Sequence, residues 1–210
     1  MSDPNQFFTA VLKGLRPLFH EQGFRPKGQN FVYETPECWS IVNFQKSRWS
    51  EQTEKTFYIN LAVTAKQLLS FEGEPTDKAP IFWKCAWDTR AEHFSPEPKI
   101  GRWTVRDETS AGETLDYLRI LLGNFAIPKV KELASESALL KMWADDSKLG
   151  YPQLKAKSAL LASRGDIDDL ERSLRTLRSV WGNGVVAEGV DDHIEKLRVA
   201  YPETLMRIKI

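Results

Sequence analysis

The chain of 210 residues lacks most of the patterns from which a chemical function can be read. It has two cysteines and three histidines, and none of these stand at the spacing of metal ligands. A phosphate-binding loop, a dinucleotide-binding fingerprint and the Gly-x-Ser-x-Gly elbow of many hydrolases are all missing. The sequence therefore predicts no cofactor, no metal site and no recognised catalytic residue.

An excess of charge of one sign is also missing, because 29 Lys and Arg residues balance 29 Asp and Glu residues. This balance gives no overall field that attracts nucleic acid or an anionic membrane. No apolar run approaches the roughly 20 residues that span a bilayer, and the first residues lack the basic and apolar regions of a signal peptide. We expect a cytoplasmic protein without a membrane partner. In that compartment Cys38 and Cys85 are expected to be reduced. A disulfide between them stays open as an alternative, because they lie in adjacent strand-like segments.

Aromatic residues are plentiful, and the first of them recur at helical spacing. Asp3 is an N-cap type of residue followed by Pro4, so a helix is expected to begin there. Its apolar stripe consists of Phe7, Phe8, Val11, Leu12, Leu15, Leu18 and Phe19. Pro17 predicts a kink or a restart within this helix, and Gly23 predicts its end.

From residue 30 the apolar period changes to that of strands. Strands are predicted around Phe31 and Tyr33, over 39–46 and 56–64, then over 81–90 and 102–106. A turn at 35–37 and other short connections indicate an antiparallel meander. Residues 65–71 are predicted as a short helix and 72–80 as a loop.

After Asp107 the pattern is helical to the end of the chain. Helices are predicted over 114–125, from Pro128 onward, and over 135–145, 152–163, 167–181 and 191–201. In the turn 163–166, Gly165 is expected to end one helix and Asp166 to cap the next. We therefore predict an α+β fold: an N-terminal helix, an antiparallel sheet of about five strands covered by helices on one face, and a C-terminal helical hairpin extension. The predicted domains are residues 1–149 and 150–210, the second packed on the first.

Three ordered segments carry a resemblance to a known family. Residues 23–31 read Gly-Phe-Arg-Pro-Lys-Gly-Gln-Asn-Phe, residues 41–47 read Ile-Val-Asn-Phe-Gln-Lys-Ser, and residues 57–63 read Phe-Tyr-Ile-Asn-Leu-Ala-Val. Over roughly residues 7–143 the chain resembles the bacterial family catalogued as domain of unknown function 4304. Members tend to carry an Arg after a Trp or His in the fourth strand, as Trp87 and Arg90 stand here, and a Trp-rich fifth strand, where this chain has only Trp103. The resemblance implies a fold and no activity.

Polar residues inside the predicted strands are the best candidates for a binding site. Asn43 and Gln45 are two residues apart and share a strand face, and Asn60 is expected across from them if the two strands are neighbours. One face of an antiparallel sheet is often exposed to solvent without binding any ligand, so a merely solvated face remains the alternative. The predicted ligand-binding residues are Asn43, Gln45, Lys46, Asn60, Arg90 and Trp103.

These observations favour a non-enzymatic binding module that recognises a protein or peptide through the open sheet face or a groove between sheet and helices. One alternative is a hydrolase or nuclease of unrecognised type centred on Arg90, Glu92 and His93. Another is single-stranded nucleic-acid binding, which needs cations interleaved with aromatic rings. The sequence interleaves Arg25, Lys27, Lys46, Arg48 and Lys55 with Phe24, Phe31, Phe44 and Trp49, but Glu34, Glu37, Glu51 and Glu54 are mixed among them. We therefore do not expect nucleic acid as the partner.

Overall fold

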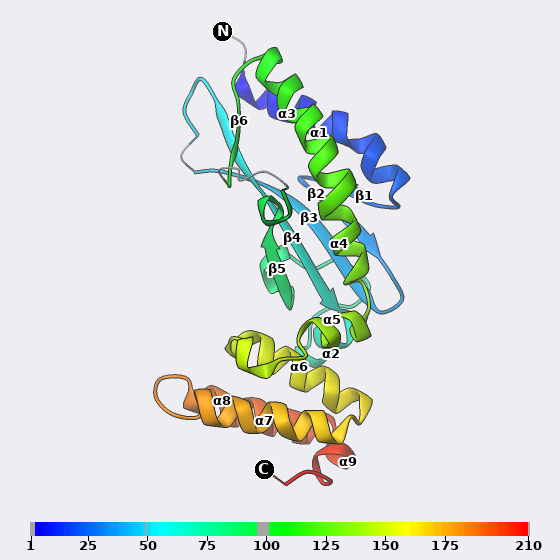
Figure 1. Ribbon diagram of the computed structural model, residues 1–210, viewed down its shortest axis with the longest axis vertical. Coiled ribbons are helices and arrows are strands. Elements are labelled where there is room, and N and C mark those ends of the chain that lie inside the picture. The colour runs from blue at the N-terminus through cyan, green and yellow to red at the C-terminus, as the bar shows by residue number, and fades with distance from the viewer. Residues whose placement is uncertain (1–2, 49, 96–100, 210) are drawn as a thin grey trace. The chain divides into compact units, whose positions relative to one another are not determined.

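The computed structural model describes residues 3–48, 50–95 and 101–209 (Figure 1). Contacts divide the chain into two compact units. The first, called here the sheet unit, comprises Met1–Thr64 and Ala79–Ala134, and the second, the helical unit, comprises Ala65–Lys78 and Ser135–Ile210. The domain boundary predicted at residue 150 lies inside the helical unit. The division into domains of residues 1–149 and 150–210 stays a prediction.

The first helix, α1, spans Pro4–Glu21 and begins as the sequence predicts. The Asp3 side chain accepts a hydrogen bond from the backbone N–H of Asn5, which satisfies one of the free donors at the helix start. At the other end Gly23 has a φ of 81°, and the backbone N–H groups of Gly23 and Phe24 bond back to His20 and Phe19. This is the Schellman arrangement that a glycine favours. The helix continues past Pro17, so the structure shows no restart there.

In the described residues six strands form one antiparallel sheet. They are β1 (Arg25–Lys27), β2 (Asn30–Glu34), β3 (Cys38–Lys46), β4 (Lys55–Ala65), β5 (Trp87–Arg90) and β6 (Trp103–Val105). The order is β1-β2-β3-β4, and both β5 and β6 pair with β4. The additional strand, β1, pairs with β2 through a tight turn in which Gly28 takes a φ of 63°, a conformation that glycine adopts without strain.

The strand predicted over residues 81–90 is wrong in its first half. Phe82–Lys84 form a 3-10 helix, and only Trp87–Arg90 pair with β4. The apolar side chains that suggested a strand are explained by packing, since Phe82 and Cys85 contact a cluster of Val32, Ile41 and Ala62 on the sheet. Apolar composition alone does not distinguish a strand from a loop that covers a sheet.

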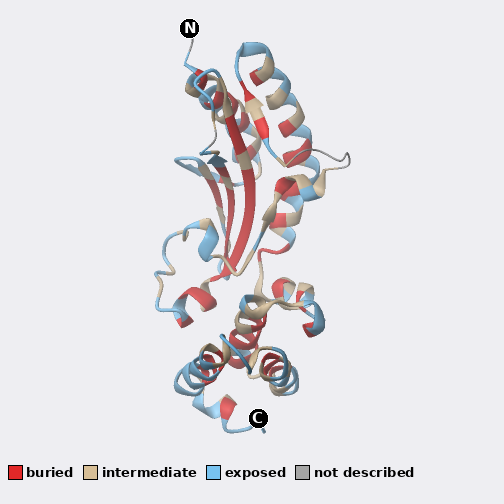
Figure 2. Cartoon of the chain, turned by 90° about the vertical axis from the view of Figure 1, so that its left-hand side faces the viewer, coloured by how far each residue is buried: buried red, intermediate tan, exposed pale blue. Residues whose placement is uncertain are grey.

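One face of the sheet is covered by helices, as predicted (Figure 2). Phe8 packs against Phe57 with ring centroids 5.1 Å apart, and Phe19 stacks on Phe31 at 3.8 Å. The helix α3 (Glu108–Leu121) packs against α1 and continues through a π-helical turn (Leu122–Ala126) into α4 (Ile127–Glu132). Aromatic pairs of this kind add to the free energy gained by burying the rings, so this side is the core of the sheet unit.

The helical unit is built from α2 (Lys66–Phe71), α5 (Glu136–Met142), α6 (Tyr151–Arg164), α7 (Ile167–Trp181), α8 (Ala187–Ala200) and α9 (Pro202–Leu205). The hairpin of α6 and α7 is confirmed, and Gly165 ends α6 with a φ of 72°. Asp166 precedes α7 but makes no side-chain capping bond; its carboxylate instead accepts from Arg164 at 3.0 Å. Leu154, Leu161, Leu170, Leu174 and Ile194 are buried in this unit, which gives it a core of its own.

Candidate functional site

The predicted polar strand residues form a hydrogen-bonded row on the sheet face that points away from α1. Asn60 Nδ2 donates to Asn43 Oδ1 at 2.8 Å and to Gln45 Oε1 at 3.1 Å, and Asn43 Nδ2 donates to Asn30 Oδ1 at 2.6 Å. We call Asn30, Asn43, Gln45 and Asn60 the amide ladder. It crosses β2, β3 and β4, because Asn30 pairs with Asn43 in the register of β2 and β3. The expectation that Asn60 lies across from Asn43 and Gln45 is therefore met by the geometry.

The members of the ladder differ in their exposure to solvent. Asn60 is buried at 5% exposure, Asn43 and Asn30 are half-buried, and Gln45 is exposed. The carboxamide of Asn43 donates one hydrogen bond and accepts one within the ladder, so one of its two N–H donors has no partner among the described residues. No hydrogen bond within the described residues uses the amide nitrogen of Gln45, which therefore remains available to solvent or to a ligand.

Arg90 extends the ladder onto β5. It pairs with Asn60 in the strand register, and its guanidinium carbon lies 4.4 Å from the centre of the Tyr58 ring. Nη1 of Arg90 is buried and has no hydrogen-bond partner among the described residues. A buried guanidinium N–H without a partner is costly unless a partner arrives, so this side chain is a donor group next to the ladder.

A loop with an exposed tryptophan borders the ladder. Residues 79–85 pack on Val32, Ile41 and Ala62, which stand two residues along their strands from Asn30, Asn43 and Asn60. Two residues of strand span roughly 7 Å, so the loop lies beside the ladder on the same face. Trp83 on this loop is 65% exposed.

The other two predicted site residues lie on the opposite, helix-covered side of the sheet. Trp103 pairs with Phe57 and stacks on it at 6.0 Å, at 7% exposure. Lys46 Nζ bonds Asn5 Oδ1 at 3.2 Å and lies 5.0 Å from the ring centre of Phe8, a residue of α1. Successive strand residues point to opposite faces, so Gln45 and Lys46 are adjacent in sequence and separated by the sheet. The six predicted residues therefore do not form one site.

The residues of the enzymatic alternative make separate contacts. Arg90 lies over Tyr58, whereas Nδ1 of His93 hydrogen-bonds Thr89 Oγ1 at 2.7 Å. Thr89 pairs with Leu61 and so faces the other side of β5 from Arg90. The Glu92 carboxylate occupies the space where a Cβ on Gly101 would stand. These contacts do not join the three side chains into one catalytic arrangement.

The aromatic and basic residues of the nucleic-acid alternative do not form a binding groove either. Phe24, Phe31 and Phe44 are buried at 2% exposure or less, and Trp49 lies outside the described residues. Arg25 forms an ion pair with Glu34 at 2.7 Å. Three of the four rings are therefore core residues rather than surfaces for stacking bases.

Three observations concern other chemistry. Cys38 and Cys85 are not joined in a disulfide, and burial raises the pKa of the Cys85 thiol to about 12. Across residues 3–48, 50–95 and 101–209, no three His, Cys, Asp or Glu side chains are grouped to hold a metal ion. Over the same ranges, no helix combines the length and the apolar character needed to cross a bilayer.

Sequence reasoning missed Asn30, the outer member of the ladder. The signal was available in the hairpin: once the turn at 35–37 joins β2 to β3, counting back from it places Asn30 opposite Asn43. The buried pair Asp146 and Lys157 in the helical unit was also missed. Here the sequence holds no signal, because a lysine within an apolar helix stripe is more often a solvated residue.

The sheet unit is thus an α+β domain with one helix-covered face and one face that carries an amide ladder. A family model described as domain of unknown function (DUF4304) matches residues 15–132, and the chain belongs to this family. The match ends before the helical extension that begins at Ser135. Comparisons with curated proteins and with solved structures found no match.

Proposed function

We propose that the protein is a non-enzymatic binding module of the cytoplasm that recognises a protein or peptide through the amide ladder. The observation that carries the proposal is the row of hydrogen-bonded carboxamides on the sheet face that points away from α1. A carboxamide has the same donor and acceptor as a peptide bond. Asn and Gln side chains on a sheet are therefore suited to polar, uncharged parts of another chain.

Preorganisation supports a binding role for this row. Asn43 and Asn60 hold each other through a 2.8 Å hydrogen bond, and both stand on long strands whose backbone is fixed by pairing. Side chains that are already ordered lose little further conformational entropy when a ligand binds.

The surroundings supply contacts of other kinds. The half-buried guanidinium group of Arg90 lies at one side of the ladder, and Trp83 offers an exposed ring on the bordering loop. Arginine and tryptophan are the residues most enriched where binding free energy is concentrated in protein interfaces. A peptide with a polar segment next to an apolar side chain fits this combination.

The proposal is tested by recovering partners from native cell extract with the purified protein as bait. We expect the double variant Asn43→Ala and Gln45→Ala to lose at least about tenfold in partner recovery, since losing two hydrogen bonds costs on the order of 1–3 kcal/mol. Quantitative mass spectrometry of the bound proteins gives the ratio. Circular dichroism on both proteins shows whether the variant remains folded.

Gln52→Ala is the matched control, because Gln52 is an exposed amide on the loop between β3 and β4 and is not part of the ladder. It should recover partners as well as the unmodified protein. Equal recovery by the folded double variant would show that the amide ladder is not the binding surface.

A further inference from the structure

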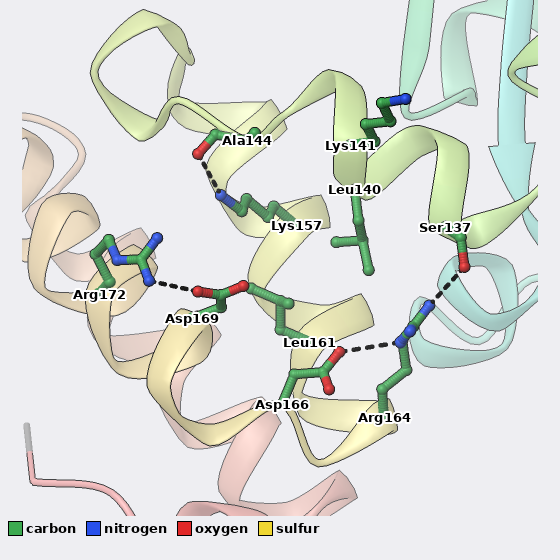
Figure 3. A pocket seen from close by; sticks show the side chains of 10 residues that line it. All are labelled: Ser137, Leu140, Lys141, Ala144, Lys157, Leu161, Arg164, Asp166, Asp169 and Arg172. Carbon is green, nitrogen blue, oxygen red and sulfur yellow. Dashed lines mark hydrogen bonds and ion pairs between the residues drawn. The ribbon is translucent and has the colours of Figure 1, made fainter.

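A pocket of about 320 Å³ opens in the helical unit between α5, α6 and α7 (Figure 3). Four basic side chains line it, namely Lys141, Lys157, Arg164 and Arg172, together with Asp166 and Asp169. Leu140 and Leu161 form the apolar middle of the lining. Figure 3 shows Lys157 and Arg172 on one side of these leucines and Arg164 with Ser137 on the other.

Lys157 is the unusual member of this lining, because its side chain is only 4% exposed. Its Nζ donates to Asp146 Oδ1 at 2.7 Å and to the carbonyl oxygen of Ala144 at 3.4 Å. An ammonium group has three N–H donors, so one of them is left without a partner among the described residues. This remaining N–H on the pocket wall can be donated to an anion, because a hydrogen bond between an ammonium group and an anion is stronger than one between neutral groups.

The buried ion pair is not explained by stability. Asp146 accepts from both Lys157 and Ser173 through Oδ1, while its Oδ2 is buried without a partner among the described residues. Removing two charges from water costs about as much as their attraction returns, and a well-packed apolar pair is often more stable. Stability alone therefore does not account for this pair, and the pair leaves Lys157 with one N–H donor that no described residue uses.

The arginines also have donors to spare. Arg172 pairs with Asp169 through Nη2, and Arg164 donates through Nε to Asp166 at 3.0 Å and through Nη1 to Ser137 at 3.1 Å. A guanidinium group has five N–H donors. Both pairs are about half exposed, and exposed ion pairs contribute only about 0–1 kcal/mol. An entering anion can therefore share or replace these carboxylates at little cost.

We propose that this pocket binds the oxyanion group of a small organic ligand, a phosphate ester or a carboxylate, whose apolar part rests on Leu140. Lys157 and Arg172 donate hydrogen bonds to the oxyanion. Leu140, which is partly exposed, favours a ligand with an apolar body over a bare ion, because covering apolar surface is favourable by roughly 25 cal/mol per Å². The site is independent of the amide ladder.

The test is calorimetric titration of the full-length protein at low salt with phenyl phosphate, benzoate and inorganic phosphate. We expect saturable binding of phenyl phosphate or of benzoate that is at least about tenfold tighter than that of inorganic phosphate. If phenyl phosphate binds more tightly, the oxyanion belongs to a phosphate ester; if benzoate binds more tightly, it belongs to a carboxylate. Raising the salt concentration should weaken the binding, because the contacts are ionic.

Two substitutions on one helix make the test specific. Arg172→Gln should weaken binding about tenfold or more, the effect of losing a hydrogen bond to a charged group. Arg175→Gln removes the same charge from α7, where Arg175 pairs with Glu171 outside the pocket lining, and should leave binding unchanged. Lys157→Gln should also abolish binding, but it leaves Asp146 unpaired, so Arg172→Gln remains informative if that variant does not fold. Absence of saturable binding to the unmodified protein, or equal weakening by Arg172→Gln and Arg175→Gln, would overturn the proposal.

Discussion

At the scale of single residues, the amide ladder shows how burial decides what an amide contributes. Asn60 is buried and donates twice, whereas Gln45 is exposed and accepts once. The chemical groups are the same, and only their access to water differs. A buried donor that loses its partner keeps its desolvation cost, while an exposed acceptor exchanges its partner for water.

We predict that Asn60→Ala destabilises the sheet unit by about 1–3 kcal/mol, because two hydrogen bonds and a buried side chain are lost. Gln45→Ala should change the free energy of unfolding by less than about 0.5 kcal/mol, as is usual at exposed positions. Urea denaturation followed by tryptophan fluorescence measures both. Equal destabilisation by the two substitutions would contradict the importance of burial in this ladder.

At the scale of elements, the ends of α1 and α3 follow local rules closely. The cap at Asp3, the Schellman turn at Gly23 and the capping box of Asp107 and Ser110 are all formed by residues within a few positions of one another. Hydrogen bonding by the Ser110 hydroxyl and backbone holds the pKa of Asp107 below its usual value. The sequence analysis predicted both ends of α1, but it began the next long helix at residue 114, whereas α3 begins at Glu108 directly after its capping residue Asp107.

Substitution of two glycines by alanine is expected to change the stability of the protein with opposite signs. Gly23→Ala should destabilise the protein by about 1–2 kcal/mol, because a side chain is strained at a φ of 81°. Gly112→Ala, inside α3 where an added Cβ meets nothing within 4 Å, should stabilise it by about 0.5–1 kcal/mol. Thermal denaturation of both variants gives the signs, and a stabilising Gly23→Ala would show that the turn is not held as described.

At the scale of the whole molecule, each unit has its own core, and the helical unit holds a buried titratable group. Nε2 of His193 lies 2.8 Å from Ser158 Oγ, and its ring contacts Phe71 edge-on. Burial, followed by the positive charges of Lys155 and Lys196, lowers the pKa of His193 to about 3. The folded protein therefore keeps this histidine neutral at pH values where an unfolded chain protonates it.

We predict that the helical unit loses stability as the pH falls below about 6.5, the pKa of an unperturbed histidine. Between that pH and about 3 the unfolded state binds one proton more than the folded state, so the free energy of unfolding falls by about 1.4 kcal/mol per pH unit. His193→Gln should be less stable at pH 7 and should show a shallower decline between pH 6 and pH 4.5. Urea denaturation across this range measures both slopes, and identical slopes would refute a neutral His193 in the folded state.

The sequence by itself determined the elements whose signals are local. Caps, glycines and apolar periods predicted the start and end of α1, the turn between α6 and α7, and strands over 39–46 and 56–64, which the structure shows as β3 and β4 with ends one residue further out at most. The shared face of Asn43 and Gln45 followed from the period of two. The family resemblance added the expectation of an α+β fold, which the structure confirms.

Only the tertiary structure decided what depends on packing between distant segments. It assigned Phe82 and Cys85 to a covering loop instead of a strand, and it placed Lys46 and Trp103 on the helix-covered face, away from the ladder. It also brought Lys157 to Asp146, a buried pair with no sequence signature. The physical reason is common to these cases: residue type and spacing specify a local conformation, whereas burial and pairing depend on which other segment covers the residue.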